Sequence, residues 1–291
     1  MSEQVRDRRQ LIDLYHTCFP DNVREEAVVE QILLAEEDPA FGVYAEGSLV
    51  AACLVHGRAV TLLAVEPAYQ GQGLGSALLQ EAEDRIRQGG YQKLTVGVGT
   101  DDKYLMPGVP MNKGADRFFR NRGYVHNWGN TGCFDMSMDL TQAKEQPVHV
   151  GDMVAGITYR LAQAKDLPGI ESCVQAAQES FVPYYLEPAH YAAGTVSPVL
   201  VAVRDGQVLG ALIVSLEVEG EGLGSVGCTA TRPEAQGQGI ATRMVQAGTQ
   251  YLKDQGMKKA FLGYTYTDIL RMYGRAGYTV CQEYFMAEKR F

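Results

Sequence analysis

Apolar and polar positions repeat in the same order in two parts of the chain. Apolar runs at Phe41–Ala45 and Leu49–Val55 are joined by a short turn, and the runs Val199–Val203 and Gln207–Val214 are joined by Asp205-Gly206. Two short apolar runs around a glycine-containing turn are typical of a β-hairpin. The pattern therefore predicts one hairpin in each half of the chain.

Two helical segments precede each predicted hairpin. They are Arg8–Phe19 and Arg24–Glu36 in the first half, and Leu167–Ser180 and Pro188–Ala193 in the second. The second half also has an opening strand, Ile157–Leu161, whereas the first half begins almost at once with a helix. We therefore expect the first domain to lack its first strand and to borrow an edge strand from the linker.

A ten-residue phrase follows each hairpin, at Pro67–Ser76 and again at Pro233–Thr242. Each copy comes after an apolar run and opens an amphipathic helix. Closely spaced glycines there leave backbone N–H groups uncovered, and the helix dipole adds partial positive charge. The phrase predicts an anion-binding turn in each half, and its repetition indicates two copies of one unit.

The two halves also end alike. Strands Leu94–Val98 and Phe261–Tyr264 are each followed by a helix that ends in glycine plus an aromatic residue, at Arg117–Tyr124 and Arg271–Tyr278. The offset between copies is 236 − 70 = 166 at the glycine phrase and 277 − 123 = 154 at the last glycine, so the first half holds 166 − 154 = 12 extra residues. They lie within Gly99–Lys113, where prolines and glycines predict a loop.

With 291 residues, the chain is long enough for two domains with separate cores. Leu140–Gly156 is polar and contains Pro147 and Gly151, which favours a linker. We therefore predict one domain over residues 1–140, a linker over 141–156 and a second domain over 157–291.

Composition narrows the class of protein. The apolar fraction of 46% and charged fraction of 21% are typical of soluble globular proteins. No apolar stretch approaches the roughly 20 residues of a membrane span, and the N-terminal residues resemble neither a secretory signal nor a transit peptide. Six cysteines without a C-x-x-C pair and five histidines without metal spacing predict a cytoplasmic protein with reduced thiols and no metal.

The net charge of −9 argues against nucleic acid as a partner, because phosphate binding needs basic patches. The same charge is compatible with a cationic substrate, although an acidic balance is common for solubility alone.

The order of elements resembles the GNAT superfamily of acyl-CoA-dependent acetyltransferases. Gln70-x-x-Gly73-x-Gly75 and Gln236-x-x-Gly239-x-Ala241 match the acetyl-CoA turn of that family at each defining position. Val65 fits the family's usual lead-in to the turn, whereas the second copy has Thr231 where an aliphatic residue is commoner. Two such domains in tandem are similar to the arrangement in the mycothiol synthase family.

The resemblance implies an α/β fold in which the fourth and fifth strands of a mixed sheet splay apart and hold acetyl-CoA in the gap. The residues that would bind acetyl-CoA in the second copy are Thr229, Ala230, Thr231, Gln236, Gly237, Gln238, Gly239, Ile240, Ala241 and Thr242. Their counterparts in the first copy are Leu63, Ala64, Val65, Gln70, Gly71, Gln72, Gly73, Leu74, Gly75 and Ser76.

A dinucleotide-binding Rossmann turn is a competing interpretation. It would need glycine or alanine where Ser76 and Thr242 stand, and it would follow its strand directly, whereas here a Pro-x-x segment intervenes. A helix-starting turn without any ligand is the other alternative.

One difference between the copies favours catalysis in the second half. Acyl transfer from a thioester to an amine needs a neutral amine, donors for the oxyanion and a proton for the departing thiolate. The resemblance implies that a tyrosine four residues before the final glycine supplies this proton. That position is Tyr273 in the second half and Phe119 in the first, and phenylalanine has no proton to give. The alternative for Tyr273 is a tyrosine that only packs on the sheet.

The sequence offers alternatives for the base and for the acceptor site. Glu217, Glu219 and Glu221 alternate, which is typical of a solvated strand face but also places one carboxylate to receive an ammonium proton. An aromatic stretch is expected either to line the acceptor site or to form a packed helix junction; it comprises Phe181, Tyr184, Tyr185, His190 and Tyr191.

Two features of the first half also allow two interpretations each. An acidic segment could attract a polyamine or an aminoglycoside, or could be an exposed helix face; it comprises Glu25, Glu26, Glu30, Glu36, Glu37 and Asp38. The loop Pro107–Pro110 could shape or plug the cleft of that half.

The sequence thus predicts a cytoplasmic, monomeric tandem GNAT N-acetyltransferase that moves an acetyl group from acetyl-CoA to an amine of a small molecule or peptide. Tyr273 would be the general acid, and the first domain would bind acetyl-CoA or be structural. The alternatives are catalysis in the first half through Asp101, Asp102 or Tyr104, and a non-catalytic acyl-CoA-binding module or sensor. No nucleic acid and no membrane are expected as partners.

Overall fold

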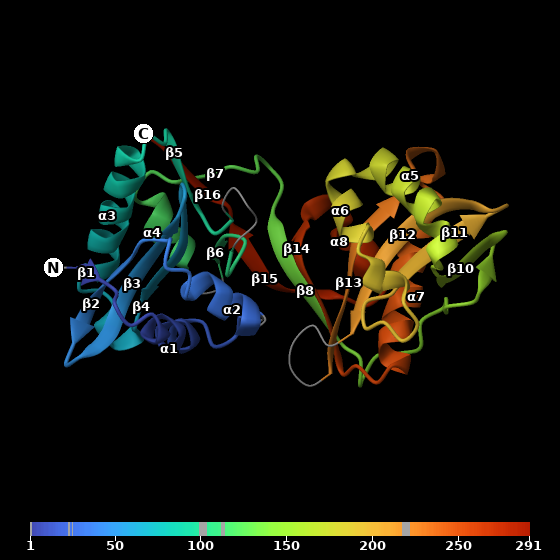
Figure 1. The fold of residues 1–291 in the computed structure, drawn as a ribbon, viewed down its shortest axis with the longest axis horizontal. Helices are drawn as coiled ribbons and strands as arrows, with labels where there is room; N and C mark the ends of the chain where they lie inside the picture. Colours follow the sequence, from blue (N-terminus) through green and yellow to red (C-terminus); the bar gives the residue numbers. More distant parts are fainter. Residues whose placement is uncertain (1, 23, 25, 99–103, 112–113, 217–221) are drawn as a thin grey trace. The chain divides into compact units, whose positions relative to one another are not determined.

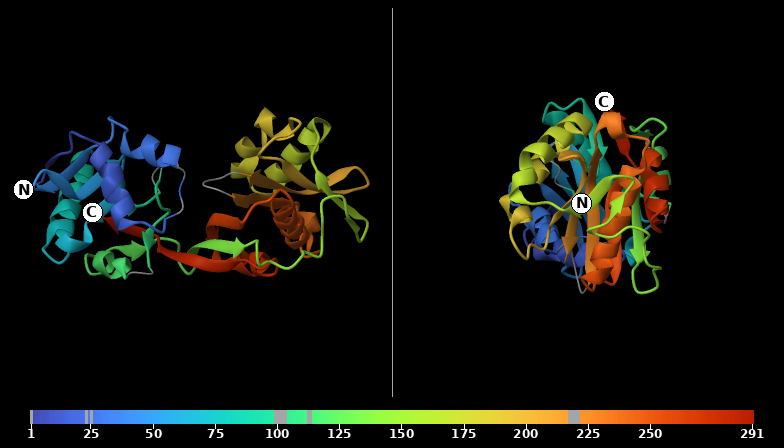
Figure 2. Two further views of the ribbon diagram at one scale, coloured as in Figure 1. Left: turned by 90° about the horizontal axis from the view of Figure 1, so that it is seen from below. Right: turned by 90° about the vertical axis from the view of Figure 1, so that its right-hand side faces the viewer.

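The computed structural model describes residues 2–22, 24, 26–98, 104–111, 114–216 and 222–291. The chain divides into two compact units. The first comprises Met1–Cys133 together with Gln282–Phe291, and the second comprises Phe134–Cys281. Each unit contains a mixed β-sheet with helices packed on both faces (Figures 1 and 2).

The first sheet has the strand order β1-β2-β3-β4-β5-β16-β7. Its only parallel pair among the described residues is β4 with β5. The elements of this unit are β1 (Glu3–Gln4), α1 (Arg9–Cys18), α2 (Glu26–Leu33), β2 (Ala40–Ala45), β3 (Ser48–His56), β4 (Ala59–Val65), the 3-10 turn η1 (Pro67–Tyr69), α3 (Leu74–Gln88), β5 (Lys93–Val96), β6 (Val109–Pro110), α4 (Ala115–Arg120), β7 (Val125–His126) and β16 (Ala287–Arg290).

The second sheet has the strand order β6-β15-β8-β14-β13-β12-β11-β10-β9. Strand β6 joins this sheet from the first unit. The remaining elements of the chain, from β8 to β15, are β8 (Cys133–Asp139), β9 (Met153–Val154), β10 (Ile157–Leu161), η2 (Ala164–Asp166), α5 (Leu167–Ala177), η3 (Glu179–Phe181), α6 (Val182–Tyr185), η4 (Pro188–Tyr191), β11 (Val199–Arg204), β12 (Gln207–Leu216), β13 (Leu223–Thr231), η5 (Pro233–Ala235), α7 (Ile240–Asp254), β14 (Lys259–Tyr266), α8 (Thr267–Gly274) and β15 (Thr279–Phe285).

Both predicted hairpins are present as β2–β3 and β11–β12. The helices are shorter than predicted. In particular, the predicted helix Pro188–Ala193 forms only the 3-10 turn η4 (Pro188–Tyr191). The short helix α6 lies between η3 and η4. Prolines at 183 and 188 explain the interruption, because a proline removes a helical hydrogen bond and clashes with the preceding turn. No helix in the described part of the chain is long and apolar enough to cross a membrane.

Each sheet buries one hydrophobic cluster on each face. In the first unit, α3 and α4 cover one face and α1 and α2 cover the other. In the second unit, α7 and α8 cover one face and α5 and α6 cover the other. Helix α3 illustrates the cause, because its apolar residues recur every three or four positions and all face the sheet; they are Leu78, Leu79, Ala82 and Ile86.

The fourth and fifth strands of each copy separate after a short parallel contact. Within the described part of the chain, Ala59–Val60 is the part of β4 that pairs with β5, and Leu223–Ser225 is the part of β13 that pairs with β14. Both β4 and β13 continue for several residues beyond the contact. This confirms the splayed strands that the GNAT resemblance implied.

Two strands belong to a different sheet from the one expected from the predicted domain boundaries. Strand β8, whose residues fall within the predicted first domain 1–140, lies between β15 and β14 of the second sheet, and the last strand, β16, lies between β5 and β7 of the first. The chain therefore passes from one unit to the other at 133/134 and at 281/282, and the predicted linker 141–156 lies within the second unit. Sequence pattern could not show this exchange, because the side-chain alternation of a short strand indicates which face is buried and not which sheet the strand joins.

The predicted linker packs on the second unit. Leu140 and Val148 are buried, at 1% and 4% exposure. The Gln146 N–H donates to Gln250 Oε1 at 2.9 Å, and Lys253 Nζ donates to the Ala143 carbonyl. These contacts fix the segment against α7, because its apolar side chains and polar backbone groups both find partners there.

The first domain does have a first strand, contrary to the prediction. The two residues of β1 pair with β2 at Glu3↔Gly42 and Gln4↔Phe41, and the Val5 N–H donates to the Ala40 carbonyl at 2.9 Å. The linker contributes no edge strand to this sheet, since its strand β9 pairs with β10 in the second sheet. A two-residue strand is too short to produce a readable alternation of apolar residues.

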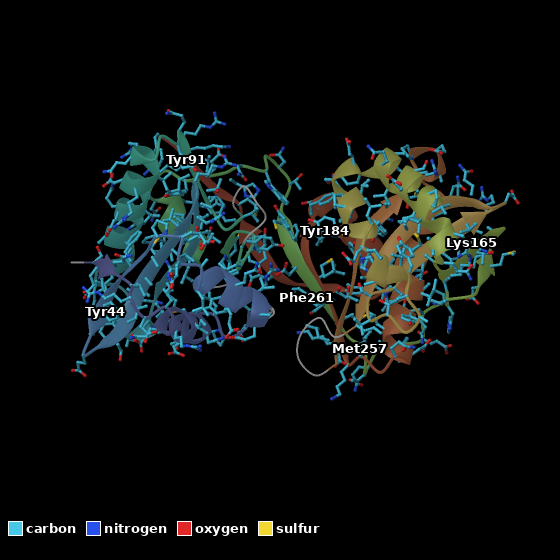
Figure 3. The ribbon with its side chains drawn as sticks, viewed as in Figure 1. Tyr44, Tyr91, Lys165, Tyr184, Met257 and Phe261 are labelled. Carbon is cyan, nitrogen blue, oxygen red and sulfur yellow. The ribbon has the colours of Figure 1, made fainter. Side chains whose placement is uncertain are left out.

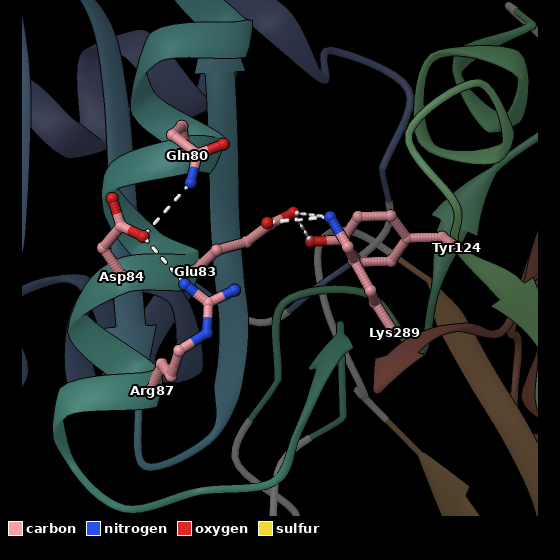
Figure 4. A network of polar contacts seen from close by, with 6 residues as sticks. All are labelled: Gln80, Glu83, Asp84, Arg87, Tyr124 and Lys289. Carbon is pink, nitrogen blue, oxygen red and sulfur yellow. Dashed lines mark hydrogen bonds and ion pairs between the residues drawn. The ribbon is translucent and has the colours of Figure 1, made fainter. Parts of the chain in front are cut away.

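A buried polar network attaches the last strand of the chain to the first unit (Figure 4). Glu83, on α3, is 4% exposed and accepts hydrogen bonds from the Tyr124 hydroxyl at 3.0 Å and from Lys289 Nζ at 2.9 and 2.8 Å. Lys289 lies on β16. A buried carboxylate requires such partners, so the network fixes the position of β16 beside α3.

Candidate active site

The two glycine turns have nearly identical backbones. Gln70 Nε2 donates to the Val65 carbonyl at 3.0 Å, and Gln236 Nε2 donates to the Thr231 carbonyl at 3.3 Å. In each copy the glutamine thus ties the turn to the end of the preceding strand. The glycines of both turns lie in the left-handed region, with φ of 77° and 86° at Gly71 and Gly73, and 76° and 75° at Gly237 and Gly239.

The turns leave space and donors for an anion. A Cβ built on Gly71, Gly73 or Gly237 would meet no atom within 4 Å. Within the described residues, no backbone N–H from Gly71 to Ser76 or from Gly237 to Thr242 donates to a backbone oxygen. The next N–H groups along the chain do: Ala77 donates to the Gly73 carbonyl, and Arg243 donates to the Gly239 carbonyl. Free N–H groups at a helix N-terminus attract phosphate, so both turns fit the pyrophosphate of an acyl-CoA.

Arginines flank both turns, which the sequence analysis missed. At the second turn, Arg243 Nη1 donates to the Gln238 carbonyl at 2.9 Å and Arg204 Nη2 donates to Gln238 Oε1 at 3.1 Å. At the first turn, Arg122 Nη2 donates to Ser76 Oγ. Arg243 is visible in the sequence one helical turn after Gly239, whereas Arg204 and Arg122 are brought in by tertiary structure.

Strand β13 contains a β-bulge at Cys228. The pairing with β12 shifts between Ala211 and Ile213, which face Ala230 and Gly227, so β13 has one extra residue there. Cys228 has φ of 49°, which is uncommon for a residue with a side chain. The bulge exchanges the faces of the strand, since Val226 lies in the cluster under α7 whereas Ala230 lies in the cluster under α5.

Thr229 therefore faces the same side of the sheet as α8, where Tyr273 lies. The Tyr273 hydroxyl is 3.4 Å from Thr229 Oγ1, and Tyr273 is 5% exposed. Burial raises the pKa of Tyr273 above its ordinary value, while the hydrogen bond with Thr229 opposes part of that increase. The phenol accordingly carries its proton at neutral pH.

The first unit has a similar register shift, without a positive φ on β4 and without the polar pair. Strand β4 has one extra residue, Thr61, because the adjacent β3 residues Leu54 and Val55 pair with Leu62 and Val60. After it, Leu63 faces the α3 side. Leu63 corresponds to Thr229 by the offset of 166 residues, since 229 − 166 = 63, and Phe119 stands where the second unit has Tyr273. Phe119 is 6% exposed and packs against Tyr124. The two positions that hold Thr229 and Tyr273 in the second unit are therefore apolar in the first.

Several other predicted residues lie outside the described part of the chain, namely Glu217, Glu219, Glu221, Asp101, Asp102 and Glu25. Tyr104 is described, and the Arg24 guanidinium lies 4.5 Å from the centre of its ring. Asp38 does not belong to an exposed helix face, because it follows α2, is 5% exposed and bonds His56 Nδ1 at 2.6 Å. Among the described residues, no group of three or more His, Cys, Asp or Glu side chains is arranged to hold a metal ion.

The aromatic stretch of the second unit is mostly a packed junction. Tyr185 is fully buried, and the Tyr191 hydroxyl donates to the Tyr185 carbonyl at 2.8 Å. The ring nitrogens of His190 contact the carbonyls of Ser197 and Tyr184. Tyr184 is the exception, at 51% exposure (Figure 3). The packing alternative therefore describes Tyr185, His190 and Tyr191, and leaves Tyr184 as the exposed aromatic side chain.

Comparison with known proteins agrees with the repeat of one fold in the two halves of the chain. The model of the acetyltransferase (GNAT) family matches residues 8–107 and 169–278, one segment in each half. No curated protein matches the chain by sequence.

Three solved structures share the fold. A GCN5-related N-acetyltransferase from Sphaerobacter thermophilus has a TM-score of 0.70 and 21% identity over 100% of this chain and 95% of its own. A tandem GNAT protein from the clavulanic acid biosynthesis pathway has a TM-score of 0.68 and 17% identity over 100% and 98%. A glucosamine N-acetyltransferase region in a fungal multi-domain β-N-acetylglucosaminidase has a TM-score of 0.73 and 19% identity; it covers 99% of this chain, which spans only 38% of that protein.

Proposed function

The chain belongs to the acetyltransferase (GNAT) family as a tandem of two such domains, and we propose that its second unit transfers the acetyl group of acetyl-CoA to an amine of a small molecule or peptide. The observation that carries this proposal is the polar pair Thr229–Tyr273, which the first unit replaces by Leu63 and Phe119. Among the described residues, the second unit has a buried, protonated phenol at this position and the first unit has Phe119 there, which supports placing the acid for the leaving group in the second unit.

The cofactor would bind along β13 and the turn that follows it. Backbone N–H groups between Gln236 and Thr242 would hold its pyrophosphate, and Arg243 and Arg204 add positive charge beside them. Residues Thr229–Thr231, on the splayed end of the strand, would face the pantetheine arm. The thioester supplies an activated acetyl group to this site.

The chemistry is a direct transfer. The amine nitrogen forms a bond to the carbonyl carbon, the carbon–sulfur bond breaks, and the Tyr273 hydroxyl gives its proton to the departing sulfur. Thr229 Oγ1 orients that hydroxyl. The second proton of the amine leaves to solvent or to a base, and Tyr273 regains its proton afterwards.

We propose that the first unit binds acetyl-CoA or is structural, and does not catalyse transfer. Its turn has open space at Gly71 and Gly73, and its N–H groups from Gly71 to Ser76 donate to no described backbone oxygen, as at the second turn. Its cleft has phenylalanine and leucine at the positions of the catalytic pair, which supports a non-catalytic role. We further propose that the protein acts as a cytoplasmic monomer.

A free-thiol assay tests the function. Acetyl-CoA and an amine panel of glucosamine, polyamines, aminoglycosides and peptides would be incubated with the protein, and release of coenzyme A would be measured. We expect Tyr273→Phe to lower kcat by roughly 10²–10⁴-fold for the accepted amine, because a positioned acid is worth that much. Calorimetric binding of coenzyme A should persist.

Phe119→Tyr is the matched variant in the first unit, and it should leave turnover unchanged. Undiminished turnover in Tyr273→Phe would refute the assignment of the acid. Coenzyme A binding without thiol release for any amine would favour the non-catalytic acyl-CoA-binding module instead.

A further inference from the structure

Tyr185 connects one face of the second sheet to the bulge that shapes the other. It ends the short helix α6, is fully buried, and packs in the cluster of α5 with Ile170 and Val174. Its hydroxyl donates a hydrogen bond to the carbonyl of Cys228. Tyr273 lies in the cluster on the opposite face, so Tyr185 touches the bulge from behind the active site.

The bulge needs such a partner. Cys228 and Thr229 have no opposing residue in the register of β12 and β13, so ladder hydrogen bonds are interrupted there. The positive φ of Cys228 adds backbone strain, which persists only where surrounding contacts maintain it. A partly buried carbonyl without a partner carries a free-energy cost, and the hydrogen bond from the Tyr185 hydroxyl removes it.

The bulge in turn decides where Thr229 points. Before it, even-numbered residues such as Val226 face α7; after it, even-numbered residues such as Ala230 face α5. Thr229 consequently faces α8 and reaches the Tyr273 hydroxyl. If the bulge relaxed, the register would slip by one residue and Thr229 would turn to the other face.

We propose that Tyr185 is a positioning residue for acyl transfer, which caps the bulge at Cys228 and thereby holds Thr229 against the general acid Tyr273. This inference rests on the proposed function. Tyr191 supports the arrangement, because its hydroxyl donates to the Tyr185 carbonyl at 2.8 Å and so steadies the end of α6.

The test compares two buried tyrosines of the same unit. Tyr185→Phe removes the hydroxyl and keeps the ring, and we expect kcat to fall by about tenfold while KM for acetyl-CoA changes less than about twofold, as for loss of one hydrogen bond that acts in the transition state. Tyr159→Phe is the control. Tyr159 is also fully buried, and its hydroxyl has no partner within the described residues, so its removal should leave kcat unchanged.

A double-mutant cycle separates positioning from general support of the fold. If Tyr185 acts through Tyr273, then Tyr185→Phe should have little further effect on kcat in the Tyr273→Phe background. Equal effects in both backgrounds, or a Tyr185→Phe enzyme as active as Tyr159→Phe, would overturn the proposal. Should Tyr185→Phe fail to fold, Tyr191→Phe provides the test: a twofold to threefold loss of kcat supports the proposal, and an unchanged kcat overturns it.

One readout does not depend on activity. The Thr229 methyl resonance, assigned with Thr229→Val, should move in the NMR spectrum of Tyr185→Phe and stay in place in Tyr159→Phe. An unmoved resonance would overturn the positioning role even if no acceptor amine were found. A moved resonance in a protein that transfers no acetyl group would instead refute the proposed function and leave the structural connection standing.

Discussion

Glu83 and Thr249 occupy equivalent positions on α3 and α7, and each forms a hydrogen bond with the hydroxyl of the tyrosine in the Gly-Tyr pair that follows the last helix of its unit. The offset is 249 − 83 = 166, and the distances are 3.0 Å for Tyr124 to Glu83 and 3.1 Å for Tyr278 to Thr249. Only the first unit adds a cation, because Lys289 from the last strand completes its site. A neutral pair in one unit has thus become a buried ion pair in the other.

The ion pair should be important for the stability of the first unit. Lys289→Met leaves the Glu83 carboxylate buried with only the Tyr124 hydroxyl as partner, and we expect the free energy of unfolding to fall by about 1–3 kcal/mol. This is below the cost for a fully buried pair, because the Lys289 side chain is 26% exposed and solvent screens part of the charge. Urea unfolding at pH 7 measures the change.

Two further variants serve as controls. Lys144→Met removes an exposed lysine and should change stability by less than about 0.5 kcal/mol. The double variant Glu83→Thr/Lys289→Met copies the neutral pair of the second unit, so it should recover much of the loss. A double variant less stable than Lys289→Met would contradict the explanation.

The two turns can be separated with one matched pair of substitutions. Gly71 and Gly237 are equivalent, have φ of 77° and 76°, and have open space at the Cβ position. Aspartate tolerates this backbone better than most residues and would place a negative charge where the pyrophosphate binds. We expect Gly237→Asp to raise KM for acetyl-CoA by at least about tenfold, since it opposes binding at the catalytic turn.

Gly71→Asp should leave KM and kcat near their original values and weaken only coenzyme A binding at the first turn. Steady-state kinetics together with calorimetric stoichiometry would record both effects. Loss of turnover in Gly71→Asp with normal turnover in Gly237→Asp would place the active cleft in the first unit.

The pH dependence of turnover should reflect the burial of Tyr273. Burial raises the pKa of this phenol above the ordinary value of about 10, and a general acid acts only while protonated. The raised pKa moves loss of the acid to higher pH, so kcat should show no falling limb below about pH 10. A rising limb at lower pH is expected as the acceptor amine loses its proton.

Profiles of kcat between pH 6 and 10 would check this expectation. A falling limb below pH 9 that is present in the original enzyme and absent from Tyr273→Phe would show that the phenol ionises more easily than its burial allows.

The repeated turn could be predicted from sequence because its determinants are local. Positive φ at Gly71 and Gly237, the helix starts and the glutamine that ties each turn to its strand all depend on residues within a few positions of each other. The contrast between Tyr273 and Phe119 was equally visible, since equivalent positions of a duplicated unit can be compared directly.

The exchange of strands, the bulge and the residues around Tyr273 could not be predicted in this way. Lys289 reaches Glu83 across 206 residues, and Tyr185 reaches Cys228 across 43. No pattern along the chain encodes such distances, so the sequence does not reveal that Lys289 of β16 pairs with Glu83 of the first unit.

The sequence by itself determined that two related acyl-CoA folds follow each other and that one of them has a tyrosine where the other has phenylalanine, because periodicity, glycine conformation and a missing hydroxyl are properties of short segments. Only the tertiary structure decided which strand completes which sheet and which side chains meet at the tyrosine. Those choices depend on burial and on hydrogen-bond partners that come together when distant segments pack.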